Sequence, residues 1–302
     1  MEELIKKHKN KVRYSKWGFV LAFIPLLGFF IFGLIPLILS FVVSLYKPLG
    51  YSFSNMNWMG LKNYTHVLTD EVFWKSVGNT FYAMLSIPIN LSLSVIIATI
   101  LTNKRMKGKG IFRTIYFLPY VCSVVAVSIM WRWAFDGEFG IINTLLSYIG
   151  IKGPDWLGNS KTLMPAMIMM SVWGGIGFNT IIFSAAMTNI DPSLYEAAEI
   201  DGAGSIARFY HITLPSISPV TFYLLSISII GGLQDFARFQ IMAPGGGPDN
   251  AGLTMVYYLY NAGFQEIITY GMGIATAVAW ILTIIVVCIT GANFKLSSKW
   301  VK

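Results

Sequence analysis

Residues 196–219 read EAAEIDGAGSIARFYHITLPSISP, a polar and charged interruption between two long apolar stretches of the chain. Charged side chains are costly inside a bilayer, so we expect at least the first half of this segment to lie outside one. Glycine favours turns, and a proline disfavours helix at the residue before it. The spacing therefore predicts a short helix, a turn at Gly202 and a second short helix that stops before Pro215.

The flanking stretches belong to a chain that is too apolar for an ordinary soluble domain. Of its 302 residues, 55% are hydrophobic and only 12% are charged, which is typical of a membrane protein. In a soluble protein, the net charge of +8 would raise the question of nucleic acid or acidic partners. Here the excess of basic residues that cytoplasmic loops carry accounts for it.

Six long windows of the sequence contain no Asp, Glu, Lys or Arg. A membrane-spanning helix needs about 20 mainly apolar residues, so each window can hold one span. The sequence therefore predicts an all-α polytopic membrane protein with six transmembrane helices. The windows are 17–46, 76–103, 114–131, 162–190, 209–234 and 267–294.

Basic residues gather in three segments that flank or separate these windows. Because cytoplasmic loops are enriched in Lys and Arg, we expect both termini and the 196–219 segment on the cytoplasmic side. An even number of spans agrees with that placement. The apolar run 17–46 is too long for a secretory signal and lacks a small-residue cleavage site, so we expect an uncleaved anchor. The three clusters are Lys6, Lys7, Lys9, Lys11, Arg13 and Lys16; Lys104, Arg105, Lys107, Lys109 and Arg113; and Lys295, Lys299 and Lys302.

The pattern within 196–219 resembles the EAA loop of permease subunits of binding-protein-dependent ABC importers. Two further stretches look like parts of the sugar-importer branch of that family: WRWAFDGEFGIIN at 131–143 and PGGGPDNAGLT at 244–254, the latter with Pro244 where Thr is expected. A surface hairpin without a partner would share the turn but not the whole string. The residues that carry the EAA resemblance are Glu196, Ala197, Ala198, Asp201, Gly202, Ala203, Phe209, Ile212, Leu214, Pro215 and Pro219.

This resemblance implies the type I ABC importer permease fold and a division of the chain into five parts. These are a basic cytoplasmic tail (1–16), a first transmembrane helix (17–46), an external loop (47–75), a permease core with five transmembrane helices (76–294) and a cytoplasmic tail (295–302). The core contains the EAA loop at 190–219, which is expected to couple the chain to a separate ATPase. The implied function is that of a translocating subunit in an ATP-driven importer for a sugar or oligosaccharide, in a bacterial or archaeal plasma (inner) membrane.

The same resemblance implies a set of partners. These are a second permease subunit, two copies of a cytoplasmic ATPase subunit, an extracytoplasmic solute-binding protein and membrane lipid, and they include no nucleic acid. The sequence has no GxxxxGK[ST] phosphate-binding loop, so we expect no catalytic residue and no cofactor on this chain. ATP and Mg²⁺ are assigned to the ATPase. His8, His66 and His211 lie in different segments without ligand spacing, and no metal site is expected.

A substrate path is predicted on the two apolar windows that flank the EAA loop. Small, polar and aromatic residues recur there at i, i+3, i+4 and i+7, which places them on one helix face. Such a face could admit a sugar ring, or it could serve only close helix packing. Asp235 could meet a sugar hydroxyl, face solvent or pair with Arg238. The candidate residues are Ser171, Gly175, Phe178, Ser228, Gly232 and Asp235, with Gly174 and Gly231 on the same faces.

Two other classes of protein stay open at this point. An ion-coupled secondary carrier or channel would need no ATPase, although none of the six windows carries a charged residue of the kind that many ion-coupled carriers use. A non-transporting membrane scaffold could use the same loop to hold a cytoplasmic partner. The completeness of the EAA pattern disfavours both, and neither the residues nor the resemblance names the sugar.

Overall fold

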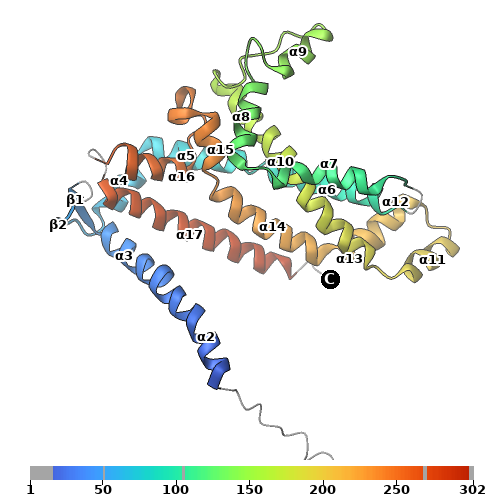
Figure 1. Ribbon diagram of the computed structural model, residues 1–302, viewed down its shortest axis with the longest axis horizontal. Coiled ribbons are helices and arrows are strands. Elements are labelled where there is room, and N and C mark those ends of the chain that lie inside the picture. Colours follow the sequence, from blue (N-terminus) through green and yellow to red (C-terminus); the bar gives the residue numbers. More distant parts are fainter. Residues whose placement is uncertain (1–15, 50–51, 104–105, 268–270, 299–302) are drawn as a thin grey trace, which may run out of the picture.

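A computed structural model describes residues 16–49, 52–103, 106–267 and 271–298 of the chain as a bundle of helices with one small sheet (Figure 1). The predicted basic tail therefore lies outside the described residues except for Lys16, as do residues 299–302 of the other tail. The predominance of helix confirms the predicted all-α class, and one small two-stranded antiparallel sheet is present beside the helices.

Four helical stretches in the described part are long and apolar enough to cross a membrane, namely Gly18–Ser44, Glu71–Thr102, Ser160–Thr188 and Gly271–Ser297. Two more spans are counted only if each of two bent helix pairs is one span. Lys109–Val121 meets Val124–Ala134 at 99°, and Ser205–Ser216 meets Ser218–Leu233 at 63°. The predicted windows 114–131 and 209–234 thus correspond to broken rather than continuous helices.

A proline lies close to each break, and its ring removes a backbone hydrogen-bond donor and disfavours helix at the residue before it. Pro119 lies near the end of α7, which stops at Val121. Pro219 occupies the first turn of α14, where a missing donor costs little. Pro215 does not stop the preceding segment, contrary to the prediction. Pro215 lies in the first turn of the short helix α13 (Leu214–Ser216), directly after a π-helical turn, so helix continues to Ser216.

The N-terminal helix projects away from the bundle (Figure 1), and contacts with the bundle lie near the end of α3 (Ile35–Ser44). There the ring of Phe41 packs edge-on against Trp280, with centroids 5.1 Å apart, and the indole of Trp280 donates to Ser40 Oγ at 3.3 Å. The segment expected to be an external loop then forms the hairpin β1–β2 followed by two helices. The elements of this part are α2 (Lys16–Phe29), η1 (Phe30–Leu34), α3 (Ile35–Ser44), β1 (Tyr46–Leu49), β2 (Ser52–Trp58), α4 (Lys62–Thr69), α5 (Glu71–Ala83) and α6 (Ser86–Thr102).

The long helix α10 is the centre of the bundle, and apolar clusters lie along it. One cluster joins it to α5, α15, α16 and α17 through buried side chains such as Phe73, Met167 and Phe239. Another joins it to α6 and α14 through Val95, Phe183 and others. The elements from the middle of the chain onward are α7 (Lys109–Val121), α8 (Val124–Ala134), α9 (Ile141–Tyr148), α10 (Ser160–Thr188), α11 (Pro192–Ile200), α12 (Ser205–Arg208), η2 (Phe209–Thr213), α13 (Leu214–Ser216), α14 (Ser218–Leu233), α15 (Ala237–Met242), η3 (Pro244–Gly246), η4 (Pro248–Asn250), α16 (Met255–Tyr260), η5 (Asn261–Gln265) and α17 (Gly271–Ser297).

The glycine-rich stretch after α15 adopts a run of left-handed backbone conformations. Gly245, Gly246 and Gly247 have φ of 70°, 92° and 70°, which glycine adopts without steric cost. The amide of Asn79 on α5 fixes the end of this run by donating to the carbonyl oxygens of Asn250 at 2.7 Å and of Leu253 at 3.0 Å. The stretch is therefore tied to the bundle.

Helices α7 and α10 cross at very short distance because Gly177 has no side chain. A Cβ built at that position would overlap the carbonyl oxygen of Tyr116 on α7. Gly174, one turn earlier on α10, has no such neighbour within 4 Å. The helix crossing thus requires glycine at position 177 but not at position 174.

We expect Gly177→Ala to destabilise the bundle by about 1–3 kcal/mol, because the added methyl must displace the α7 backbone. The midpoint of thermal unfolding of the detergent-purified chain measures this. Gly174→Ala is the matched control and should leave the midpoint unchanged or raise it slightly, because alanine favours helix more than glycine does. Equal midpoints for the two variants would contradict the tight crossing.

Candidate functional site

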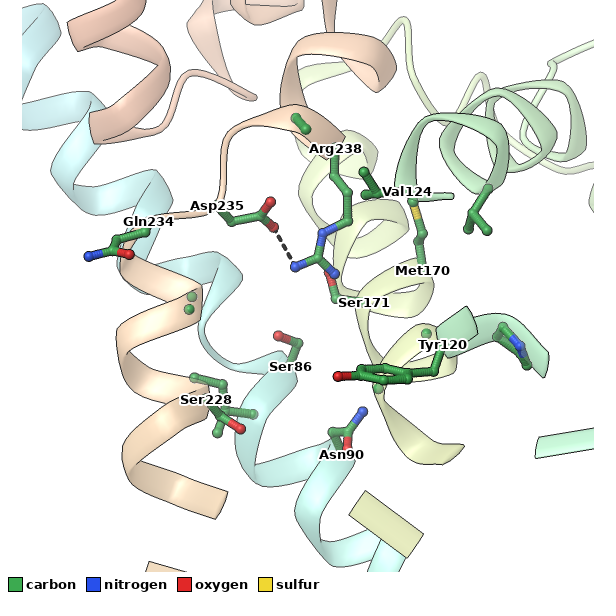
Figure 2. A pocket seen from close by; sticks show the side chains of 18 of the residues that line it. Ser86, Asn90, Tyr120, Val124, Met170, Ser171, Ser228, Gln234, Asp235 and Arg238 are labelled. Atoms are coloured by element: carbon green, nitrogen blue, oxygen red, sulfur yellow. Dashed lines mark hydrogen bonds and ion pairs between the residues drawn. The ribbon is translucent and has the colours of Figure 1, made fainter. Parts of the chain in front are cut away.

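A cavity of about 690 Å³, here called the central cavity, lies between α6, α7, α8, α10 and α14 and the start of α15 (Figure 2). That volume is in the range of sites for small ligands. Its lining residues are Ser86, Ile87, Asn90, Pro119, Tyr120, Cys122, Val124, Val127, Met170, Ser171, Gly174, Gly175, Asn179, Ser228, Gly231, Gly232, Gln234, Asp235, Phe236, Ala237 and Arg238.

The structure places five of the six predicted path residues in this lining: Ser171, Gly175, Ser228, Gly232 and Asp235. Phe178 is not in the lining. Its ring stacks on Tyr120, with centroids 4.7 Å apart and planes 18° apart. Tyr120 does line the cavity, and Figure 2 shows its hydroxyl pointing into the space between the helices.

The two predicted glycines also serve helix packing, which was the alternative interpretation. A Cβ at Gly175 would come within 2.5 Å of the Asn90 amide nitrogen. A Cβ at Gly232 would lie 3.3 Å from side-chain atoms of Ile87 and Met84. Each glycine therefore lines the cavity and lets α6 approach.

Asn90 is a hydrogen-bond centre for the wall formed by α6 and α10. Its amide donates to the carbonyl oxygen of Val172 at 2.8 Å, and its own oxygen accepts from the Asn179 amide at 2.6 Å. The side chain is buried, so these bonds fix its orientation. The available sequence signal for this residue was an Asn in the middle of the apolar window 76–103, between the asparagines near its two ends.

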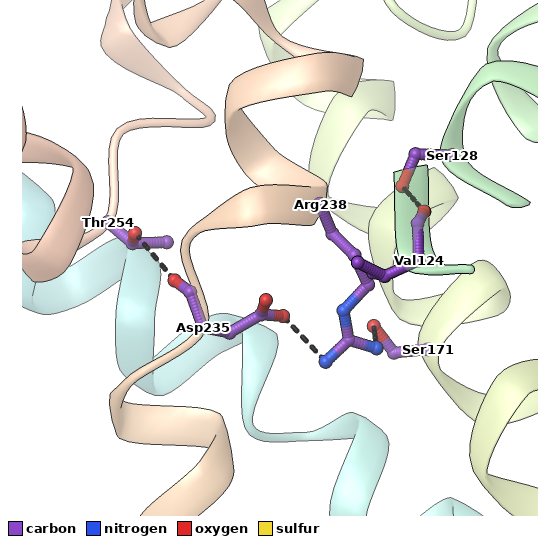
Figure 3. Close-up of polar contacts among 6 residues, drawn as sticks. All are labelled: Val124, Ser128, Ser171, Asp235, Arg238 and Thr254. Atoms are coloured by element: carbon purple, nitrogen blue, oxygen red, sulfur yellow. Dashed lines mark hydrogen bonds and ion pairs between the residues drawn. The ribbon is translucent and has the colours of Figure 1, made fainter. Parts of the chain in front are cut away.

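Asp235 and Arg238 form an ion pair at one end of the cavity, which is one of the three roles open for Asp235. The guanidinium Nη2 lies 2.7 Å from the carboxylate, and Nη1 donates to Ser171 Oγ at 3.3 Å (Figure 3). The backbone oxygen of Asp235 accepts from Thr254 Oγ1 at 3.1 Å. The pair spans the bend between α14 and α15.

The EAA loop begins with a well-capped helix, α11. The Asp191 carboxylate accepts from the backbone N–H of Ser193 at 2.9 Å, and this bond lowers the pKa of Asp191 because it stabilises the charged form. The helix ends at Ile200, and Gly202, two residues later, has a φ of 77°. There the N–H of Ala203 donates to Ala198 O at 2.8 Å and the N–H of Gly202 to Glu199 O at 3.1 Å, a Schellman motif.

Two side-chain contacts tie α11 to the segment after the turn. Arg208 Nη1 lies 2.9 Å from Glu199 Oε2, and the hydroxyls of Tyr195 and Thr213 are 2.9 Å apart. Sequence reasoning did not single out Tyr195, Glu199 or Thr213 for this role, because pairing across a turn depends on the fold. Together these contacts bind the two halves of the loop into one unit.

The predicted residues of the EAA loop separate into an outward group and an inward group. Glu196, Ala197, Asp201 and Gly202 are exposed, whereas Ala198, Ala203, Ile212 and Pro215 are half-buried. Phe209 and Leu214 pack against the apolar cluster of α6, α10 and α14. The first half of the loop is thus presented at the surface while the second half is rooted in the bundle.

The turn predicts a clear difference between two glycines. Because a side chain in the left-handed region costs about 1–2 kcal/mol, Gly202→Ala should weaken the end of α11. We expect amide hydrogen exchange across 192–203 to accelerate by roughly 5- to 30-fold. Gly204, at φ −68° with nothing within 4 Å of a built Cβ, gives the control Gly204→Ala, which should not change exchange. Similar exchange in both variants would argue against a turn that requires glycine.

Known proteins with the same organisation are found by sequence and by structure. Residues 90–300 match the family model described as "Binding-protein-dependent transport system inner membrane component". The arabinooligosaccharides transport system permease protein AraP of Halalkalibacterium halodurans is 34% identical, over 88% of this chain and 83% of its own length. The lactose transport system permease protein LacF of Rhizobium radiobacter is 34% identical, over 92% of each chain.

Among solved structures, a chain of a bacterial ABC transporter involved in the import of the acidic polysaccharide alginate superposes with a TM-score of 0.81. It is 25% identical, and the match covers 94% of this chain and 96% of that one. This agrees with the predicted type I permease architecture. By sequence and by fold, the chain belongs to the family of binding-protein-dependent transport system inner membrane components and is a multi-pass permease subunit of an ABC importer.

Proposed function

We propose that this permease subunit lines the path of a sugar or oligosaccharide through the central cavity and couples that path to a separate ATPase. One observation carries the proposal. The EAA loop is the direct connection between α10, which ends at Thr188, and α14, which begins at Ser218, and both helices line the cavity. A displacement of the loop is therefore delivered to both cavity walls as a rigid-body movement, a common mode of switching.

The lining of the cavity supports a glycan as the substrate. Hydroxyl groups of Ser86, Tyr120, Ser171 and Ser228 and the amide of Asn90 face a space of about 690 Å³. Such groups both donate and accept hydrogen bonds, as sugar hydroxyls require. The relatives whose names mention arabinooligosaccharides and lactose take glycans of this kind.

The exposed half of the EAA loop supports docking on an ATPase. Apolar side chains lie open there next to the acidic residues of α11: Leu194, Ile200, Ile206 and Tyr210 are 50%, 88%, 76% and 60% exposed. Exposed apolar groups beside charged ones are typical of protein-binding surfaces. In this arrangement two ATPase copies hold ATP and Mg²⁺, a second permease completes the pore, and an extracytoplasmic binding protein delivers the solute.

The proposed orientation follows from the same loop. With the EAA loop facing a cytoplasmic ATPase, both termini lie on the cytoplasmic side, and the hairpin β1–β2 lies at the opposite end of the helix bundle from α11 (Figure 1). Glu196 and the neighbouring Ala197 and Ala198 are proposed as the part of the loop that enters the ATPase.

Purification of the tagged chain from gently solubilised native membranes tests the assembly. We expect a second permease and an ATPase to co-purify, and ATP hydrolysis to rise when the sugar-loaded binding protein is added. A chain that purifies alone, without ATPase activity, and drives uptake in vesicles from an ion gradient would favour the secondary carrier instead.

Changes on the exposed apolar surface of the loop should separate docking from folding. Ile200→Asp and Ile206→Asp place a charge where an apolar contact is proposed, so we expect at least about a tenfold loss of co-purifying ATPase. Leu61→Asp is the matched control, since Leu61 is 67% exposed but lies outside the loop. It should retain the ATPase, and equal loss in all three variants would count against this surface.

Changes at the stacked aromatic pair test the substrate path. Tyr120→Leu removes the ring and the hydroxyl that face the cavity, so we expect uptake to fall by at least about tenfold, by analogy with the loss of a buried hydrogen-bonding anchor. Phe178→Leu alters the layer behind it and should reduce uptake less. Uptake that depends on Phe178 more than on Tyr120 would reverse the assignment of the direct contact.

A further inference from the structure

The charge in the central cavity comes from two neighbouring side chains. Among the described residues of its lining, Asp235 and Arg238 are the ionisable residues that carry charge at neutral pH. Arg238 Nη2 lies 2.7 Å from Asp235 Oδ2. The Asp235 side chain is 13% exposed and the Arg238 side chain is 29% exposed. An opposite pair at this distance and burial cancels most of the field that either group would project alone.

Neighbouring contacts hold this pair in the lining. Arg238 also donates to Ser171 Oγ at 3.3 Å, and Thr254 Oγ1 holds the backbone of Asp235 at 3.1 Å. Figure 2 shows both charged side chains directed toward the same space as Ser86 and Tyr120. A ligand in the cavity therefore meets a carboxylate and a guanidinium that neutralise each other rather than an isolated charge.

A carboxylate entering this site would be at a disadvantage. It would lose its water shell without gaining an unpaired cation, and it would approach the Asp235 carboxylate while contacting Arg238. An uncharged sugar bears no such desolvation cost and can hydrogen bond to the serine hydroxyls and the Asn90 amide. The two ligand classes thus differ in their interaction with the same pair.

We propose that the Asp235–Arg238 ion pair is a specificity device that keeps the central cavity electrically neutral, so that it admits uncharged glycans and excludes glycans bearing a carboxylate. This rests on the proposed role of the cavity as a sugar path. Arg238 is then a specificity-determining residue, and Asp235 acts by neutralising it. Removal of Asp235 alone converts the cavity into a site that attracts anions.

Cys122 provides a reporter inside the same cavity. Its side chain is exposed and lines the space, and the other cysteine, Cys288, lies on α17 outside the lining. We would use the full-length chain in native membranes with Cys288→Ser, and two methanethiosulfonate reagents that carry glucose or glucuronate. The Cys122 thiolate attacks the sugar-bearing sulfur, a disulfide forms, and methanesulfinate leaves with its electron pair.

We would measure the rate at which each reagent modifies Cys122 and take the ratio of the glucose-reagent rate to the glucuronate-reagent rate. This ratio is then divided by the ratio that the two reagents give with 2-mercaptoethanol in solution. Because both reagents react with the same thiolate, changes in the reactivity of Cys122 cancel. In the Cys288→Ser background we expect a ratio of roughly 3 or more. An unpaired charge on the order of 10 Å away in a partly dry cavity alters such a ratio by roughly tenfold.

Asp235→Asn should therefore lower the ratio by roughly tenfold, Arg238→Gln should raise it, and the double variant should return it to within about twofold of the background. Arg208→Gln, which breaks the ion pair in the EAA loop, is the charge-matched control and should leave the ratio unchanged. The substitutions are close in shape to the native residues, and recovery in the double variant shows that the fold is intact.

A ratio that moves less than about twofold in either single variant, or a background that already prefers glucuronate, overturns the proposal. The assay needs neither ATP nor a partner protein. Flat ratios would therefore remove this inference while the importer assignment stands, and a failure of ATPase co-purification would remove the coupling proposal while these ratios stay readable.

Discussion

In the hydrocarbon of a membrane every backbone N–H and C=O needs a partner within the protein, so irregular backbone is tolerated only where protein or a polar cavity surrounds it. The arrangement of this chain follows from that constraint. The α7–α8 break at Cys122 and the α14–α15 bend at residues 234–236 both border the central cavity. These two irregular segments thus lie beside polar groups of the lining, whereas the break between Ser216 and Ser218 lies outside the lining. Tyr120 and Arg238, which both line the cavity, each lie beside one of these two irregular segments.

The second consequence is mechanical. Since the EAA loop is the chain connection between α10 and α14, whatever holds the loop rigid also links the two cavity walls. Three polar contacts link the two halves of the loop at different places. They are the Schellman turn at Gly202, the Glu199–Arg208 ion pair and the Tyr195–Thr213 hydrogen bond. Exposed ion pairs contribute little to stability, so the apolar anchoring of Phe209 and Leu214 in the bundle is the stronger element. The apolar packing of Phe209 and Leu214 holds the loop against the bundle, and the polar contacts fix its shape.

Sequence reasoning succeeded where helices are regular and was incomplete where they are not. Ser171 with Gly175, and Ser228 with Gly232, fall on one face because α10 and α14 keep the periodicity of a straight helix across those positions. Tyr120 was missed, and Arg238 was named only as a possible partner of Asp235, because Tyr120 precedes a break and Arg238 follows one, and periodicity does not predict side-chain direction there. Phe178 has the right spacing, but a second ring stands between it and the cavity. The hairpin β1–β2 was missed because its segment lacks the regular alternation of apolar and polar residues that indicates a strand.

The ion pair also connects the cavity to α15 and to the start of α16. Asp235 and Arg238 stand on either side of the α14–α15 bend, and Thr254, which begins the helix after the glycine-rich stretch, holds the backbone of Asp235. Replacing a buried pair by apolar residues of similar volume is often neutral or stabilising, so stability alone is a weak reason for charges at this place. Their position gives a stronger one. A ligand that contacts either side chain also contacts the residues that set the bend, so recognition of the ligand and the angle between α14 and α15 depend on the same two side chains.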